Sequence, residues 1–323
     1  MTTRDHMMRA ALYDRFGGPE VLYVGEAPRP EPRPGEALVR VRAVSVNGGE
    51  AFVRSGKYRV LTGRRFPKRV GLDLVGEVAA LGTGTTGLGV GDRVWGVLGL
   101  TSGFGSAAEY VAVPADRLGR VPDGLDPVLA AALPIGTTAI TALRDKARLR
   151  PGESLLVRGA AGGVGHAAVQ LGRAHGAEVT GLARAANLDF VRELGADHAV
   201  DHRAVAPRDL GRFDVVLDTV GTELATYRGL LTPGGRMVTI ALDHRRPATT
   251  LTAIAASAVH GRGRVRFFSG DPRRPLLDDL ARHVAEGTLR PMVDTVFPLA
   301  EIAAAHQALA DGGVRGKYVV RVD

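Results

Sequence analysis

The sequence predicts an α/β protein in which a doubly wound parallel sheet is joined to a β-rich domain. Three observations support this prediction. A glycine-rich turn stands between an apolar run and a helical segment in the middle of the chain. Strand-like and helix-like segments then alternate as far as Phe268. The chain before Pro122 consists instead of short strand-like runs separated by glycine turns, as in a small barrel-like domain.

The glycine-rich turn lies within residues 154–184, SLLVRGAAGGVGHAAVQLGRAHGAEVTGLAR. An apolar run enters the turn, a helix follows, and a second apolar run closes the segment. The turn matches the G-x-G-x-x-G dinucleotide fingerprint in its later glycines, with Ala160 in place of the first. Such glycines allow a tight turn, and the N–H groups at Gly162, Gly163 and Val164 would then face a pyrophosphate. The alternative is a turn that is tight for structural reasons only.

In the β-rich part before Pro122, strands are predicted where apolar and polar residues alternate, and turns where glycine and proline cluster. Two strands are expected within Met8–Val24, on either side of a glycine–proline turn. A short helical turn is expected at Ala51–Tyr58. Further strands are expected at Ala37–Val46, Val75–Ala80, Arg93–Val97 and Ala107–Val113.

The second part begins with an alanine-rich helical stretch, Asp126–Leu143, which Pro134 is expected to break. Strands are then expected at Leu155–Val157, Glu178–Leu182, Ala199–Asp201, Val215–Leu217, Arg236–Ile240 and Val265–Phe268, and helices at Val164–His175, Asn187–Leu194 and Glu223–Leu230. The remaining chain is expected to form helices at Pro275–Glu286 and Leu299–Leu309 and strands at Thr295–Phe297 and Gly316–Val322.

The dinucleotide-binding segment is flanked by other structure on both sides. This arrangement predicts one domain made of residues 1–126 and 271–323, with a cofactor domain of residues 127–270 inserted into it. Ligands of open α/β sheets bind at the carboxyl ends of the strands. The active site is therefore expected in a cleft between the two domains.

Composition narrows the class of protein. Of the 323 residues, 45% are apolar and 24% charged, as in a soluble globular protein, and neither a membrane-spanning segment nor a signal peptide is expected. A cytoplasmic protein is expected. The absence of cysteine excludes disulfides, thiolate catalysis and zinc sites that need sulfur. The net charge of +8 comes from scattered arginines, so nucleic acid is not expected as the main partner, although this charge would attract an anionic cofactor.

Several motifs together carry a resemblance to a known family. They are VSVN (44–47), RSGKY (54–58), GLDLVGEV (71–78), GVGDRVWG (89–96), GAAGGVG (159–165), LGAD (194–197), DTVG (218–221) and RGKYVV (315–320). In this order they resemble the medium-chain dehydrogenase/reductase superfamily, and most closely its zinc-independent quinone oxidoreductase branch, from about Met8 to the end. The resemblance implies a GroES-like catalytic domain, a Rossmann domain that binds NADPH, and a homodimer.

Zinc-dependent members of that superfamily need a cysteine after an early strand and a G-H-E segment later. Here these places hold Asn47-Gly48-Gly49-Glu50 and Gly71-Leu72-Asp73, which offer neither cysteine nor histidine. The histidines of the chain also lack metal-ligand spacing. No metal is therefore expected.

Without a metal, the simplest remaining chemistry is hydride delivery from NADPH to a quinone or an α,β-unsaturated carbonyl, whose conjugation spreads the incoming charge onto an oxygen. An enoyl reductase or tailoring reductase of a biosynthetic pathway is an alternative within the enzymes. A second alternative is a non-catalytic protein that binds NADPH, with RNA as its partner.

Asn47 and Tyr58 are the catalytic candidates. Asn47 ends a strand at the expected cleft, where its amide would bond a substrate oxygen or the cofactor; the alternative is a residue that caps the strand end. Tyr58 matches a tyrosine of the substrate pocket in quinone oxidoreductases, although a phenol of this kind is often a packing residue. The sequence departs from the family's usual N-P-x-D at Asn47, and Phe52 stands where the family often has tyrosine. These departures leave the native substrate open.

Arg184 is expected to determine whether the protein binds NADPH or NADH. The end of the second strand faces the adenine ribose, where an acidic side chain would accept from the 2′-hydroxyl of NAD and an arginine would pair with the 2′-phosphate of NADP. No Asp or Glu occurs between Val179 and Asn187. NADPH is therefore the expected cofactor, and the alternative is that Arg184 is a solvated charge.

The remaining cofactor candidates lie in loops that follow strands or match the family. They are Thr138, His202, Thr219, Val220, Ala241, Leu242, Phe268, Ser269, Arg315 and Lys317. For Thr138 a structural role is the alternative, and for the two C-terminal cations an ordinary basic surface pair.

Overall fold

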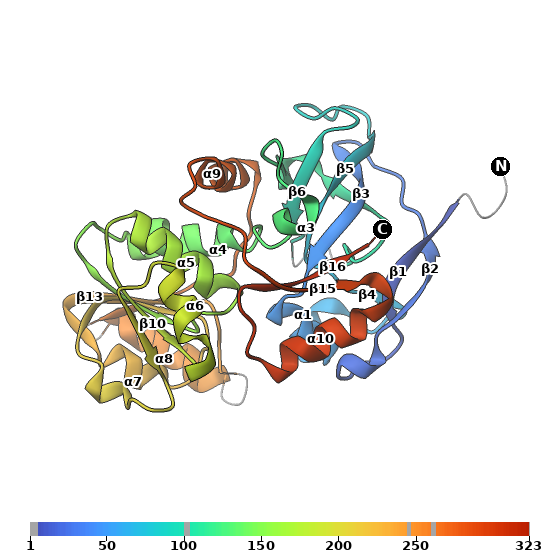
Figure 1. Ribbon diagram of the computed structural model, residues 1–323. Coiled ribbons are helices and arrows are strands. Elements are labelled where there is room, and N and C mark those ends of the chain that lie inside the picture. Colours follow the sequence, from blue (N-terminus) through green and yellow to red (C-terminus); the bar gives the residue numbers. More distant parts are fainter. Residues whose placement is uncertain (1–5, 100–103, 244–246, 260–262, 323) are drawn as a thin grey trace. The chain divides into compact units, whose positions relative to one another are not determined.

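A computed structural model describes residues 6–99, 104–243, 247–259 and 263–322, which form two compact units (Figure 1). The first unit comprises the described residues up to Ile135, together with Asp271–Glu286 and those from Pro291 onward. The second comprises Gly136–Gly270 and Gly287–Arg290. These limits differ from the boundaries expected from sequence because α3 (Pro127–Ala130) packs against β-strands of the first unit.

The second unit is built on a six-stranded sheet in which every neighbouring pair is parallel. Its strands are β9 (Ser154–Arg158), β10 (Glu178–Ala183), β11 (His198–Asp201), β12 (Phe213–Asp218), β13 (Leu231–Thr239) and β14 (Arg264–Phe267). In space their order is β11-β10-β9-β12-β13-β14. The chain therefore starts in the middle, moves outward to one edge, and returns to build the other half. This order confirms the doubly wound fold and puts a switch point between β9 and β12.

The helices of this unit either precede β9 or connect the parallel strands. They are α4 (Gly136–Ile140), the π-helical segment η4 (Thr141–Ala147), α5 (Gly163–Ala174), α6 (Leu188–Glu193), α7 (Leu224–Arg228) and α8 (Pro247–Val259). Crossovers between parallel strands are right-handed, so helices of the two halves cover opposite faces of the sheet. α8 was not expected, because its sequence PATTLTAIAASAV shows no period of polar and apolar residues that would mark a helix.

The first unit contains two sheets. Strands β2 (Tyr23–Pro28), β1 (Met7–Tyr13) and β4 (Lys68–Arg69) form one sheet in that order. The other has the order β15-β16-β3-β5-β6-β8, with β7 also paired to β3, and its strands are β3 (Glu36–Ser45), β5 (Asp73–Leu81), β6 (Arg93–Val97), β7 (Tyr110–Pro114), β8 (Leu118–Arg120), β15 (Val293–Pro298) and β16 (Lys317–Arg321). The expected β-rich character is thus confirmed.

Strand β3 positions the candidate site of the first unit. β5 pairs with one edge of β3, while β7 and β16 share the other edge, β7 along residues 36–40 and β16 along residues 43–45. Helix α1 (Gly48–Arg54) begins where β3 ends, and α2 (Arg59–Thr62) follows. The pairing of Val319 with Ser45 brings the start of β16 beside the junction of β3 and α1.

Two further helices complete the first unit. α9 (Arg274–Ala285) packs against β8 through Leu277 and Leu280, both of which are fully buried. α10 (Ile302–Asp311) buries Ile302 and Ala305 in the apolar core that β3, β5 and β16 share. Among the helices of the described residues, none is long and apolar enough to span a bilayer.

Candidate active site and cofactor site

The glycine-rich loop after β9 has the geometry of an anion cradle. Gly159 has φ +72°, and a Cβ there would lie 2.5 Å from Thr219 Oγ1. A Cβ on Gly165 would lie 2.0 Å from the carbonyl oxygen of Gly159, so any other residue would push the turn and the helix apart. The N–H of Gly162 donates to Gly159 O (3.0 Å) within the turn. The N–H groups of Gly163 and Val164 begin α5, where a helix has no acceptors of its own, and are therefore available to an anion.

A buried ion pair that sequence reasoning missed joins this loop to the one after β12. Arg158, the last residue of β9, donates from Nη1 to Asp218 Oδ1 at 2.9 Å; Arg158 is 5% exposed and Asp218 not at all. The Asp218 carboxylate also accepts the N–H groups of Val220 (3.0 Å) and Gly221 (3.1 Å). Thr219 donates its hydroxyl to Arg158 O at 2.7 Å. The pair therefore fixes both loops at the switch point, including Thr219 and Val220.

Further contacts hold the guanidinium of Arg158 in place. It donates to Thr222 O (2.6 Å) and lies 3.6 Å above the centre of the Tyr227 ring, a cation–π contact. The signal in the sequence was a charge at the end of each apolar strand, LLVR and VVLD. Because such charges are costly inside a sheet unless they are paired, two of them at the ends of neighbouring strands predict an ion pair.

Arg184 follows β10 and is exposed, and its guanidinium has no hydrogen-bond or ion-pair partner among the described residues. The neighbouring strand β11 pairs Asp201 with Ala183, so His202 lies beside the backbone of Arg184. His202 contacts Ala183 O through Nδ1 at 2.7 Å. Arg203, which was not expected from sequence, follows and is exposed. Arg184 and His202 thus come together at one corner of the sheet edge.

The other cofactor candidates of the second unit follow β13 and β14 or belong to α4. Ala241 and its neighbour Leu242 follow β13, where Ala241 O accepts the hydroxyl of Thr239 (2.8 Å). Phe268 is buried, with the ammonium of Lys146 5.7 Å from its ring centre. Ser269 comes next, and a Cβ on the following Gly270 would lie 3.4 Å from Thr138 Oγ1. Since parallel strands end at one edge of the sheet, these loops share that edge with the glycine-rich loop.

In the first unit, Asn47 lies at the centre of a buried polar cluster and is 5% exposed. Its Nδ2 donates to Asp73 Oδ2 (2.9 Å), Ser45 O (3.0 Å) and Glu50 Oε1 (3.2 Å). Its Oδ1 accepts from Lys317 Nζ at 2.7 Å. The amide donors of Asn47 are therefore already engaged within the protein.

Lys317 is 4% exposed, and its ammonium donates to Val46 O (2.8 Å) as well as to Asn47. Two candidates far apart in the sequence, one for catalysis and one for cofactor binding, are thus in direct contact. Burial lowers the pKa of Lys317, while the charges of Asp73 and Glu50 act in the opposite direction. Asp73 also accepts the N–H of Ser45 (2.6 Å) and its hydroxyl.

The carboxyl group of Glu50 has a raised pKa. Burial and the charge of Asp73 raise its pKa to about 7, although hydrogen bonds from Asn47 and from the N–H of Gly71 (3.0 Å to Oε2) oppose the rise. His306 of α10 has its Nε2 3.7 Å from the same Oε2. Arg54 Nη1 lies 2.7 Å from His306 Nδ1 and can only donate, so the ring proton is on Nε2 and faces Glu50. Burial and Arg54 lower the pKa of His306 to about 3, which keeps the ring neutral.

Tyr58 is 43% exposed and lies between α1 and α2. Its ring meets that of Phe52 edge to face, with centroids 6.3 Å apart, and the ammonium of Lys57 lies 5.3 Å from the Phe52 ring centre. The last candidate, Arg315, donates its backbone N–H to Asp294 Oδ2 at 2.7 Å. Tyr58 thus presents its ring to solvent.

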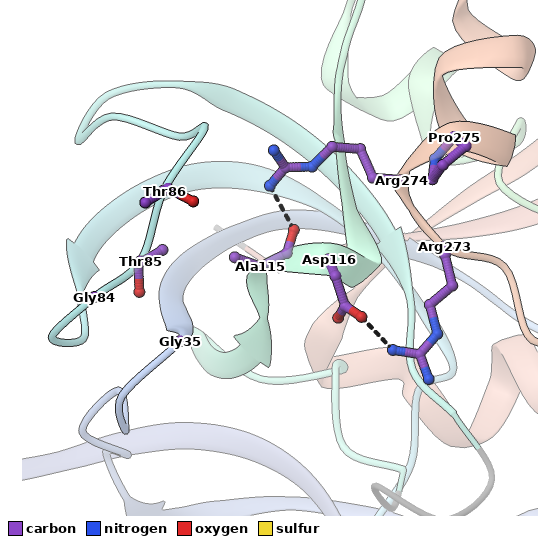
Figure 2. Close-up of a pocket in the computed structure, with 9 residues that line it drawn as sticks. All are labelled: Gly35, Gly84, Thr85, Thr86, Ala115, Asp116, Arg273, Arg274 and Pro275. Carbon is purple, nitrogen blue, oxygen red and sulfur yellow. Dashed lines mark hydrogen bonds and ion pairs between the residues drawn. The ribbon is translucent and has the colours of Figure 1, made fainter.

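A recess of about 530 Å³ in the first unit does not coincide with any candidate (Figure 2). Its two arginines are already engaged: Arg274 donates to Ala115 O (2.7 Å) and Leu118 O (3.1 Å), and Arg273 pairs with Asp116 at 2.5 Å. They tie the start of α9 to the segment before β8. In the part of the chain that the structure describes, no three His, Cys, Asp or Glu side chains are grouped to hold a metal, and His244 and His260 lie outside it.

Comparisons with known proteins cover nearly the whole chain. Residues 33–123 match the alcohol dehydrogenase GroES-like domain, and residues 194–320 match the family described as zinc-binding dehydrogenase. The quinone oxidoreductase of Sus scrofa is 30% identical over 338 residues, 99% of either chain. The structure of the quinone oxidoreductase from Coxiella burnetii superimposes with a TM-score of 0.88 at 30% identity, covering 98% of this chain and 100% of that one.

A second group of relatives is much larger. A mycocerosic acid synthase-like polyketide synthase of Mycobacterium tuberculosis is 34% identical over 310 residues, which are 91% of this chain and 14% of that protein. The similarity to this synthase is thus confined to one segment of it.

Proposed function

The chain belongs to the medium-chain dehydrogenase/reductase superfamily, in its quinone oxidoreductase-like branch, and we propose that it transfers hydride from NADPH to a quinone or another α,β-unsaturated carbonyl compound. It is an oxidoreductase of a family that uses a nicotinamide cofactor. The choice of NADPH and the class of substrate are the proposal.

The position of Arg184 is the observation that supports NADPH as the cofactor. An exposed guanidinium at the carboxyl end of β10, beside His202, suits the 2′-phosphate of NADPH, because charge-assisted hydrogen bonds to phosphate are strong. The 2′-hydroxyl of NADH would call for a carboxylate there, and none occurs from residue 179 to 187.

The nicotinamide cofactor supplies the hydride, and the chain supplies orientation. In the second unit, the N–H groups of Gly163 and Val164 would hold the pyrophosphate, and the Arg158–Asp218 pair would keep the Thr219–Val220 loop in place. In the first unit, the exposed phenol of Tyr58 would donate a hydrogen bond to the substrate oxygen as negative charge develops on it.

We propose that this chemistry does not use zinc. The ammonium of Lys317 lies 2.7 Å from Asn47 Oδ1, at the residue where zinc-dependent members carry a cysteine ligand. A second cation placed there would meet the buried charge of Lys317 at short range, where the repulsion is strong.

The test replaces Arg184 with Asp. The apparent KM for NADPH should rise by about a hundredfold, as expected for the loss of a charge-assisted pair, whereas that for NADH should not rise, because the new carboxylate can accept from its 2′-hydroxyl. Arg192→Asp is the matched control, because Arg192 is exposed on α6, where it pairs with Asp189. Equal effects of Arg184→Asp on the two cofactors would refute the proposal.

An enoyl reductase is the second candidate, because the similarity to the polyketide synthase spans 91% of this chain. A screen of NADPH oxidation with quinones, simple enones and enoyl thioesters separates the two. Turnover of enoyl thioesters without turnover of quinones would favour the second candidate. Tight NADPH binding with no turnover of any of these compounds would instead favour a non-catalytic role.

A further inference from the structure

We propose that Lys317 is a positioning residue, which orients the carboxamide of Asn47 and thereby the start of α1, rather than a residue that contacts the cofactor. The ammonium is 4% exposed and donates to Asn47 Oδ1 (2.7 Å) and Val46 O (2.8 Å). Both acceptors lie at the junction of β3 and α1. The inference rests on the proposed function, because Tyr58 is the residue assigned there to the substrate.

The lysine selects one of the two orientations of the amide. With Oδ1 toward Lys317, the amide nitrogen donates to Asp73 Oδ2, Ser45 O and Glu50 Oε1, so both ends of the amide meet groups of the correct polarity. Rotation by half a turn would place the amide N–H groups against the ammonium and the carbonyl oxygen against two carboxylates. In a buried cluster such mismatches are costly, so the cation fixes the orientation.

Asn47 in turn determines where α1 begins. Its backbone N–H donates to Glu50 Oε1 at 3.1 Å, and Glu50 Oε2 accepts the N–H of Gly71 at 3.0 Å. The first turn of α1 is thereby attached to the loop before β5. Phe52 is the fifth residue of α1, and the centre of its ring lies 6.3 Å from that of Tyr58. A substitution of Lys317 is therefore expected to shift the position of Tyr58, because α1 connects Asn47 to the Phe52 ring that Tyr58 contacts.

The charge of Lys317 also acts on Glu50. Titratable and polar groups face Glu50 from several elements. They are Asn47 immediately before α1, Arg54 of α1, Tyr13 of β1, the N–H of Gly71, Asp73 of β5, His306 of α10 and Lys317 of β16. Among them Lys317 lowers the pKa of Glu50 and Asp73 raises it. Without the ammonium, the pKa of Glu50 would rise further, so its carboxyl group would be protonated at higher pH and would accept the N–H of Asn47 more weakly.

The first test is Lys317→Met, which keeps an unbranched side chain of nearly the same length and removes the charge. We expect kcat/KM for the quinone to fall by about tenfold or more, as a displaced substrate contact would cause, while the Kd of NADPH stays within about twofold. The loss of kcat/KM on acidification should also begin at higher pH than in the wild type. Arg282→Met, on the exposed face of α9, is the matched control and should change none of these values.

A cofactor contact would give a different result. If NADPH binding weakens tenfold while kcat and the quinone KM at saturating NADPH are unchanged, Lys317 contacts the cofactor and the inference is wrong. It is equally wrong if the variant matches the wild type in every value.

Lys317→Gln distinguishes the effect of the lysine on the orientation of the Asn47 amide from the effect of its charge on Glu50. It is also the variant to measure if Lys317→Met does not fold. Its amide can still donate to Asn47 Oδ1, so we expect kcat/KM at alkaline pH to recover while the shifted pH dependence remains. A pH profile identical to that of the wild type would overturn the charge argument.

A measurement without turnover distinguishes this inference from the proposed function. In NMR spectra of the wild type, the side-chain N–H groups of Asn47 should exchange slowly with D2O, and in Lys317→Met they should exchange much faster. If the wild type reduces no quinone or enone, the proposed function fails while this readout still tests the inference. Unchanged exchange in Lys317→Met would refute the positioning role even in an active enzyme.

Discussion

The ion pair between Arg158 and Asp218 allows a quantitative test of the second unit. Asp218→Asn removes one charge and almost no volume, and leaves the guanidinium of Arg158 buried. Removal of one partner of a buried ion pair typically costs about 3–5 kcal/mol. Arg158 would keep the Thr222 carbonyl (2.6 Å) and the face of Tyr227 (3.6 Å), so we expect the lower end of that range, about 3 kcal/mol.

The opposite substitution should cost less. In Arg158→Met the carboxylate of Asp218 would still accept the N–H groups of Val220 (3.0 Å) and Gly221 (3.1 Å), which stabilise its charge. We expect about 2 kcal/mol for this change. The double variant leaves no unpaired charge, so its cost should fall short of the sum by about 2 kcal/mol, which is the coupling between contacting partners.

The stability of the second unit, which contains the Arg158–Asp218 pair, must be measured separately from that of the first. Hydrogen–deuterium exchange of the amides in β9 and β12 gives the free energy of opening of the second unit. The fluorescence of Trp95, which is fully buried in β6, follows the first unit as an internal control. Additive costs in the double variant, or equal losses in both units, would refute the role given to the pair.

Two further predictions concern single residues. Burial and Asp73 raise the pKa of Glu50 from 4.5 to about 7, so between these values the native chain holds a proton that the unfolded chain has released, and stability falls as pH rises. Glu50→Gln should abolish this fall, which amounts to about 2 kcal/mol between urea titrations at pH 5 and pH 7.5; an unchanged difference between the two would contradict it. Gly165→Ala would place a Cβ 2.0 Å from Gly159 O and should weaken dinucleotide binding about tenfold or more, as measured by NADPH fluorescence. Gly89→Ala, with 3.8 Å to the nearest atom, is the control, and equal binding by both variants would show that the approach at Gly165 is unimportant.

Local patterns in the sequence were sufficient to predict the parallel sheet of the second unit and the glycine-rich turn after β9. The turn after β9 and the alternation of strands and helices are features of neighbouring residues, and the handedness of crossovers then limits the order of strands. α8 was not predicted, because its residues are nearly all small or apolar and so do not alternate between a polar and an apolar face.

The polar cluster of the first unit could not be derived in the same way. Asn47 and Lys317 were both named as candidates, yet their contact depends on the pairing of Val319 with Ser45, which no local pattern specifies. The sequence therefore indicated which residues matter but not that the amide of Asn47 is engaged by Asp73 and Glu50. In the absence of that information, a direct contact with a ligand was the natural expectation for Asn47.

The pairing of β16 with β3 has a consequence for how the chain folds during synthesis. Nearly all of the second unit comes from one continuous stretch, Gly136–Gly270, so its sheet can form as soon as that stretch has left the ribosome. The first unit cannot complete its sheet until β16 arrives, almost a full chain length after β3. We therefore expect the unit with the glycine-rich loop to fold first. Until β16 is synthesised, the edge of β3 that β16 will occupy is paired with β7 along residues 36–40 and unpaired along residues 43–45.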